Sequence, residues 1–204
     1  MVKKLVKVWD GKNLIEDNIV FLKQKTKEVR LPLSQECKKI LENLLDTFKA
    51  TPCAGIAANQ IGYDKNIFIG LKEDDYDDGN DEDKPPVIGN PNAENYEFYI
   101  NPKIDYCSKK SLQEGEEGCL SIPEIRLIAE RYDKIKIRYF NAQGKKIKKP
   151  LSGFISRLFQ HEIDHLNGIL MVENSKIKKV YRISENENVE LLYSDLVKKL
   201  SIYL

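Results

Sequence analysis

His161 and His165 are the only histidines of the chain, and they lie four residues apart in the pattern His-Glu-x-x-His. In an α-helix, residues at this spacing differ by about 40° around the axis and about 6 Å along it, so both imidazoles can reach one metal ion from the same face. Glu162 then projects near the open coordination position, where a carboxylate can carry the proton of an attacking water. The spacing therefore predicts a metal-dependent hydrolytic site.

A catalytic site of this type needs a third protein ligand. Position 171, where one class of zinc proteases carries a third histidine, is Met171. Glu173 is a possible carboxylate, but it follows the histidines too closely for the second-helix glutamate of other zinc proteases. Cys119 is the better candidate, because Gly118 before it and Pro123 soon after it indicate an irregular strand end that aims the side chain at a neighbour. The alternative for Cys119 is a buried, unreactive thiol.

Three helices are predicted around this site. The apolar stripe of residues 34–49 follows Ser34, a good N-cap, and forms the N-terminal helix. The helix that carries both histidines spans 153–166, with Ser152 as N-cap and Asn167-Gly168 as its stop. Residues 187–203 form an amphipathic C-terminal helix.

Strands are predicted mainly in the middle of the sequence. The first 30 residues alternate weakly and indicate a short strand or two. Residues 67–69 and 98–104 read as strands, the second broken at Asn101-Pro102, and 135–147 reads as a hairpin. The fold class is therefore α+β, with mainly antiparallel sheets packed around the central histidine-bearing helix and with an N-terminal and a C-terminal helix.

Composition excludes several classes of protein. The 204 residues, with a net charge of +1, suit a single domain over 1–204 and give no general basic field for nucleic acid. No apolar run is long enough to span a membrane, and the N-terminus does not read as a secretory signal. The four cysteines, none at CxxC spacing, indicate a reducing compartment.

Residues 72–97 differ in character from the rest of the chain. They are acidic and rich in Asn, Gly and Pro, and 73–83 alone carry eight acidic side chains. Such a segment buries too little apolar surface to offset its ordering entropy. We therefore expect a mobile, dispensable surface insertion.

Three segments together resemble the peptide deformylase family, which removes the formyl group from the initiator methionine of new polypeptides. They occur in the family's order and are Gly55-Ile56-Ala57-Ala58-Asn59-Gln60, Glu117-Gly118-Cys119-Leu120-Ser121 and Gln160-His161-Glu162-Ile163-Asp164-His165. The resemblance covers roughly 34–172. It has one departure in the first motif, where Cys53 stands at a position that is usually glycine in the family, and 1–33 lack the expected N-terminal pattern.

The resemblance implies a role for each motif residue. Cys119, His161 and His165 would be the metal ligands, and Glu162 the general base and acid. The side-chain amide of Gln60 and the backbone N–H of Leu120 would hold the oxygen that gains charge when water attacks. Substrate-binding positions would be Ala54, Gly55, Ile56 and Glu117, with Phe154 and Leu158 as the walls of an apolar methionine pocket.

The same resemblance implies a cofactor and partners. The cofactor would be one divalent ion, iron(II) physiologically, with zinc, nickel or cobalt tolerated. The substrates would be N-formyl-Met peptides, without direct nucleic-acid specificity, in a bacterial cytoplasm or in an organelle after removal of a transit peptide. A basic C-terminal region would dock on the ribosome; it comprises Lys176, Lys178, Lys179, Arg182, Lys198 and Lys199.

Two other functions remain open at the level of sequence. A zinc-dependent endopeptidase also carries His-Glu-x-x-His, but no third histidine or second-helix glutamate is recognisable here. A binding module with a structural metal site would need four protein ligands, and only three are found.

Overall fold

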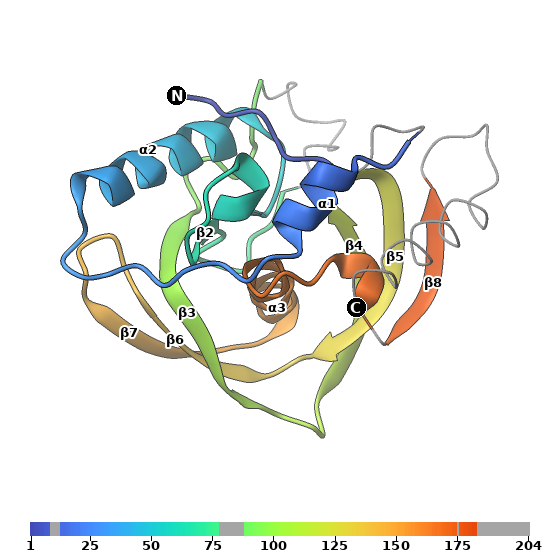
Figure 1. Ribbon diagram of the computed structural model, residues 1–204. Helices are drawn as coiled ribbons and strands as arrows, with labels where there is room; N and C mark the ends of the chain where they lie inside the picture. Colours follow the sequence, from blue (N-terminus) through green and yellow to red (C-terminus); the bar gives the residue numbers. More distant parts are fainter. Residues whose placement is uncertain (9–12, 78–87, 175, 183–204) are drawn as a thin grey trace.

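The helix that carries both histidines, α3 (Gly153–Leu166), lies between two antiparallel sheets in the computed structural model (Figure 1). The structure describes residues 1–8, 13–77, 88–174 and 176–182. Within these ranges no helix is long and apolar enough to cross a membrane. The α+β class predicted from the sequence is confirmed.

The larger sheet has five strands in the order β1-β2-β3-β6-β7, and the smaller has three in the order β4-β5-β8. Every pairing is antiparallel, and β1 and β4 each lie at a sheet edge. The strands are β1 (Gly55–Ala57), β2 (Ile67–Gly70), β3 (Glu97–Cys107), β4 (Leu112–Cys119), β5 (Ile122–Tyr132), β6 (Ile135–Phe140), β7 (Lys146–Leu151) and β8 (Ile177–Arg182).

The predicted N-terminal helix is α2 (Gln35–Ala50), and its start and end are where the sequence places them. The Oγ of Ser34 accepts a hydrogen bond from the backbone N–H of Cys37, which satisfies one donor of the first turn. Ile40, Leu44 and Phe48, at four-residue spacing, are almost completely buried in the larger of two apolar cores. This face holds α2 against the five-stranded sheet.

The central helix is buried on most of its surface, as expected for a helix between two sheets. Its first N–H, on Gly153, donates to Asp133 Oδ1 at 3.1 Å, so the predicted cap Ser152 makes no side-chain bond. The helix ends at Leu166, and two residues later the chain turns at Gly168, whose φ is +73° and where a Cβ would lie 2.2 Å from the carbonyl oxygen of Lys23. Only glycine fits this stop.

Aromatic rings fill the space between α3 and the larger sheet. Phe68 stacks on Tyr99 at 4.4 Å between ring centroids, and Phe159 meets both rings edge-on. All three side chains are almost completely buried. A second core, which includes Cys119, lies under the smaller sheet and near η2 (Met171–Glu173). The site helix is thus fixed from two sides.

Two sequence predictions about the strands are wrong. The N-terminal region contains α1 (Glu16–Leu22), whose Ile19 and Leu22 are buried, instead of short strands. Asn101-Pro102 does not end a strand, because β3 continues through it with a shift of register. Asn101, at φ 48°, forms this bulge and hydrogen-bonds the backbone of Val29 in both directions at 2.8 Å. The predicted C-terminal helix, 187–203, lies outside the described residues.

The acidic insertion is attached to the rest of the fold near its C-terminal end by a buried asparagine, Asn90; that the insertion is dispensable stays a prediction. Asn90 and Asn92 are both 3% exposed. Asn90 donates to the carbonyl oxygens of Phe48 and Cys53, and Asn92 exchanges two hydrogen bonds with the backbone of Asp77. Buried amides with satisfied partners fix a backbone, even in an acidic segment. Residues 78–87 lie outside the described range.

Candidate active site

Cys119, His161 and His165 meet at one point between the two sheets, and their ligand atoms all lie within 4.8 Å of one another. The Sγ of Cys119 is 3.2 Å from Nε2 of His165. All three side chains are buried. Among the described residues, this is the one group of three or more that could hold a metal ion.

Local structure explains why these side chains converge. The histidines lie one helical turn apart on the same face of α3, as their spacing predicts. Cys119 is the last residue of β4, where the register with β5 shifts between Gly118 and Cys119. A Cβ at Gly118 would lie 2.0 Å from the guanidinium of Arg126, so glycine at this irregular strand end leaves room for the Arg126 side chain to lie across it.

The donor set fits a divalent transition metal, because one thiolate and two imidazoles are ordinary ligands of such ions. Burial alone would raise the pKa of Cys119, but the charges and hydrogen bonds of His165 and His161 hold it well below its usual value. The thiol is therefore held in the thiolate form that binds metal. Nδ1 of His161 faces Glu117 Oε2 at 3.0 Å, which leaves Nε2 for the metal.

Glu117 orients His161 from a buried ion-pair network. Arg131 binds both carboxylate oxygens of Glu117, at 2.8 and 2.9 Å, and Arg157 binds Oε1 at 3.0 Å. Burial alone would raise the pKa of Glu117, but Arg131 and His161 hold it well below the usual range. The carboxylate therefore stays ionised and keeps a proton on Nδ1 of His161. Because these partners occupy the carboxylate, the predicted substrate-binding role of Glu117 would fall to its backbone.

The two arginines of this network were missed in the sequence. Arg157 lies in an otherwise apolar stretch of α3, and a charged residue on the inner face of a buried helix is the signal for a partner. Its guanidinium also donates to the carbonyl oxygens of Gln113, Gly115 and Ala129, at 3.0–3.1 Å. A Cβ at Gly115 would lie 2.9 Å from the guanidinium of Arg157, so a glycine at this position of β4 leaves the space that the arginine occupies.

Glu162 lies against Gly55 of β1 and keeps one carboxylate oxygen without a partner among the described residues. Its side chain is buried and its Oε2 has no hydrogen-bond partner. A Cβ at Gly55 would lie 2.8 Å from Glu162 Oε1 and 3.1 Å from Leu158 Cδ1. Burial raises the pKa of Glu162 to about 7, which suits a group that both takes and returns a proton.

The side chain of Gln60 contacts the metal-binding group at Cys119. It lies in η1 (Ala58–Ile61), and its Oε1 accepts from the backbone N–H of Ala57 at 2.9 Å. This bond orients Nε2 toward Ser121 Oγ at 3.2 Å and Cys119 Sγ at 3.6 Å. Leu120 directly follows Cys119 in the turn between β4 and β5. Both predicted donors therefore lie next to Cys119.

The predicted substrate-binding residues divide into two groups. Gly55 and Ile56 lie in the edge strand β1 and Ala54 directly precedes it, and Gly55 lies against Glu162. Phe154 and Leu158 lie on the same face of α3 as Glu162, at successive four-residue steps toward the start of the helix. The structure thus places these residues along one line that leads away from the metal-binding group.

Cys53 also lies close to this line. Its buried environment, and next the charge of Glu162, raise the pKa of the Cys53 thiol. A thiol held neutral in this way is a small apolar side chain and not a nucleophile. Its carbonyl oxygen accepts from Asn90 at 3.1 Å, so Cys53 connects the first motif to the acidic insertion.

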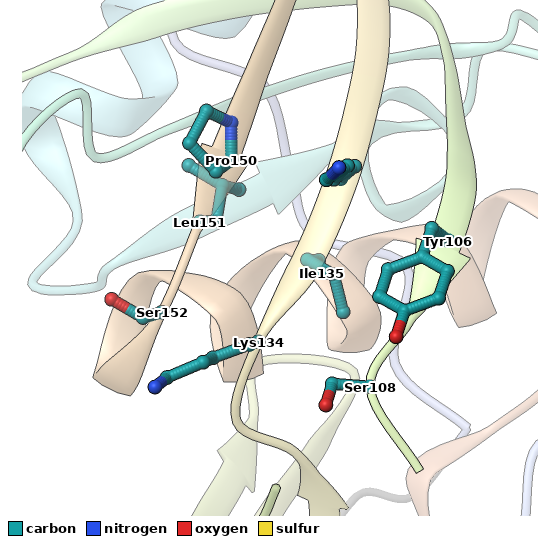
Figure 2. Close-up of a pocket in the computed structure, with 8 residues that line it drawn as sticks. Tyr106, Ser108, Lys134, Ile135, Pro150, Leu151 and Ser152 are labelled. Carbon is teal, nitrogen blue, oxygen red and sulfur yellow. The ribbon is translucent and has the colours of Figure 1, made fainter. Parts of the chain in front are cut away.

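A hollow of about 380 Å³ lies apart from this site (Figure 2). It opens where the ends of β3 and β7 meet the start of β6. None of the predicted catalytic, metal or substrate-binding residues lines it. The lining residues are Tyr106, Ser108, Lys134, Ile135, Lys136, Pro150, Leu151 and Ser152.

A buried Cys/His/His group beside a His-Glu-x-x-His glutamate defines a metal-dependent hydrolase. The sequence profile of the family described as Polypeptide deformylase matches residues 12–181, so the chain belongs to the polypeptide deformylase family. This family is metal-dependent, and its function is the deformylation of nascent chains. The chain is therefore an enzyme that removes the N-formyl group from the initiator methionine of new polypeptides.

Individual relatives agree with this assignment. The peptide deformylase of Fusobacterium nucleatum is 37% identical over 153 residues, which are 74% of this chain and 76% of the relative. That of Thermotoga neapolitana is 35% identical over 142 residues, 70% of this chain and 74% of the relative.

Solved structures agree as well. A Met-Ala-Ser-bound peptide deformylase from Acinetobacter baumannii is 31% identical, with a TM-score of 0.66 over 85% of this chain and 99% of that one. A Synechococcus elongatus deformylase in complex with actinonin is 25% identical, with a TM-score of 0.66 over 97% and 85%.

Proposed function

We propose that the chain carries out deformylation with one divalent ion held by Cys119, His161 and His165, and with Glu162 as the proton carrier. The observation that supports this most is the convergence of the three ligand atoms within 4.8 Å, where Cys119 at the end of β4 meets the two histidines of the helix that also presents Glu162 to β1. When bound, the ion supplies a Lewis acid that activates water and polarises the formyl group.

Iron(II) is the ion that we propose for the native enzyme, on the resemblance of the three motifs to the family. Zinc, nickel and cobalt are accepted by the same thiolate and imidazole donors. Metal analysis of protein purified without oxygen tests this choice. Iron in stoichiometric amount supports it, and zinc with full activity under those conditions contradicts it.

The protein's own groups would act on the formyl carbon as follows. Glu162 takes a proton from the attacking water and returns it to the departing amine, which a carboxyl with a pKa near 7 does well. The side-chain amide of Gln60 and the backbone N–H of Leu120 donate to the oxygen that gains negative charge. Both are neutral donors, so they stabilise that charge without competing for the metal.

The substrate would lie along the open edge of β1. The backbone of Ala54, Gly55 and Ile56 would pair with it, because an unpaired edge strand presents free N–H and C=O groups. Leu158 and Phe154 would line the pocket for the methionine side chain. Glu117, whose carboxylate is held by Arg131 and Arg157, would contribute through its backbone in the edge strand β4.

Formate release from formyl-Met-Ala tests the proposed chemistry, with unformylated Met-Ala and a casein peptide as controls. We expect formate from the first and no cleavage of the other two. Formyl-Asp-Ala tests the apolar pocket, and equal rates on both formyl-dipeptides would contradict it. Cleavage of casein would instead support an endopeptidase.

The metal ligands are tested separately by Cys119→Ser. A serine hydroxyl stays protonated where the thiol ionises, so this variant should lose most of its metal. Cys37→Ser, which changes a buried thiol of the other core, is the matched control and should bind metal normally. Full occupancy in Cys119→Ser would remove Cys119 from the ligand set.

We also propose a bacterial-type cytoplasmic location and ribosome docking through the basic C-terminal region. In the described part of this region, Lys176 pairs with Glu130 and Lys178 lies 3.9 Å from Glu114. Lys198 and Lys199 lie outside the described residues. Co-sedimentation with ribosomes, repeated with Lys176, Lys178 and Lys179 changed to serine, tests the proposal, and equal sedimentation of both proteins would contradict it.

A further inference from the structure

Tyr76 is an aromatic residue of the acidic insertion that lies against the start of the site helix. Its ring stacks on the ring of Phe154, with 4.9 Å between centroids and 22° between planes. A Cβ at Gly153 would lie 2.8 Å from Asp74 Oδ2, so a second contact places the same segment at this end of α3. Tyr76 is 45% exposed, so one side of the stacked pair faces outward.

The segment that carries Tyr76 is held in place by two asparagine amides, one of them buried. Asp77 exchanges two hydrogen bonds with Asn92, at 2.9 and 2.8 Å, and Asn92 is 3% exposed. Glu73 exchanges two with Asn95, both at 3.0 Å. Tyr76 lies between these two attachments, which fix the backbone on either side of it. These backbone hydrogen bonds therefore help to hold the Tyr76 ring against Phe154, in addition to the contact between the rings.

Tyr76 lies at the far end of the line that starts at Glu162. Glu162, Leu158 and Phe154 follow one another at four-residue steps on α3, and each step is about 6 Å along the axis. The aromatic pair is thus about 12 Å from the level of Glu162. An extended peptide advances about 3.3 Å per residue, so this distance corresponds to about three to four residues.

The strand β1 points a bound peptide in this direction. Gln60, which would hold the formyl oxygen, follows the end of β1. At the other end, the carbonyl oxygen of Ala54 accepts from the N–H of Leu71 at 3.0 Å, and Leu71 leads into the segment of Tyr76. A substrate that begins beside Gln60 and pairs along β1 therefore continues toward that segment.

We infer that Tyr76, stacked on Phe154, is a specificity-determining residue that contacts the third residue of the substrate. The exposed face of the pair is flat and apolar, so it favours an aromatic residue at that position. This inference rests on the proposed binding of the substrate along β1. It gives the acidic insertion a part in substrate choice that its composition does not suggest.

Three substrates separate this contact from the basic reaction. Formyl-Met-Ala lacks a third residue, and formyl-Met-Ala-Ser and formyl-Met-Ala-Phe differ only there. An aromatic pair contributes enough to change a rate about three- to tenfold, so we expect kcat/KM for the Phe peptide to exceed that for the Ser peptide by this factor. In Tyr76→Ala the ratio should fall to about one, with formyl-Met-Ala unchanged.

Two further variants control the experiment. Tyr76→Phe keeps the ring and should keep the ratio. Tyr106→Ala removes a comparably exposed tyrosine at the separate hollow of Figure 2 and should also keep it. An unchanged ratio in Tyr76→Ala, or an equal loss on formyl-Met-Ala, would overturn the inference. A native enzyme that releases no formate from formyl-Met-Ala would overturn the proposed function itself.

Discussion

At the scale of single residues, the site depends on where side chains are absent as much as on where they are present. Gly55 leaves the space into which Glu162 projects, and Gly115 leaves the space for Arg157. The carboxylate of Glu117 takes three hydrogen bonds from two arginines and then faces Nδ1 of His161. The metal-binding geometry is therefore set by residues that do not touch the metal.

Gly55→Ala tests the space in front of Glu162. Its Cβ would lie 2.8 Å from Glu162 Oε1, so the carboxylate must move and kcat/KM should fall at least tenfold, with metal content unchanged. Gly70→Ala is the matched control, because Gly70 pairs with Gly55 across the ladder and its Cβ would meet nothing closer than 3.4 Å. Equal activities of the two variants would contradict this reading of Gly55.

Arg157→Met tests the buried network. It removes one charged partner from Glu117 and leaves three carbonyl oxygens without their donor, so the free energy of unfolding should fall by about 2–3 kcal/mol. Arg126→Met, at an exposed arginine of the same sheet, should cost less than about 1 kcal/mol. Urea denaturation measures both. A stability equal to that of the native protein in Arg157→Met would mean that Arg131 alone holds Glu117.

At the scale of elements, the sequence predicted what depends on local signals. Helices α2 and α3 have caps, apolar stripes and stops, and both were placed within a residue or two. Helix α1 was missed because its seven residues hold only two buried positions, too few for a visible period. The bulge at Asn101 was read as a break, because its hydrogen bonds to Val29 join residues 72 positions apart.

The acidic insertion shows the same limit. Its charge predicts solvation, but two buried asparagines override composition where they find backbone partners. Asn92→Ala removes both hydrogen bonds that Asn92 makes with the backbone of Asp77 and should lower the free energy of unfolding by about 1–3 kcal/mol. Asn95→Ala, which loses similar but more exposed bonds, should cost less. Thermal unfolding of both variants measures this, and equal, negligible shifts would contradict an anchoring role for Asn92.

At the scale of the whole molecule, two sheets hold α3 between them (Figure 1), and Gly55 of the edge strand β1 and Cys119 of the edge strand β4 both lie at the site. The sequence identified the three ligands and Glu162, because spacing on a helix and three ordered motifs are local patterns. It did not reveal Arg131, Arg157 or Tyr76, whose contacts join segments far apart in the chain. Their roles depend on how the two sheets close around the helix.

The central claim is that Glu162 carries the proton and does not bind the metal. Glu162→Ala, assayed for both bound metal and formate release from formyl-Met-Ala, tests it most directly. We predict one metal ion per chain, as in the native enzyme, with turnover lower by a factor of about 10² or more. Protein that has lost its metal would show that Glu162 is a ligand, and metal-loaded protein with native turnover would show that another group carries the proton.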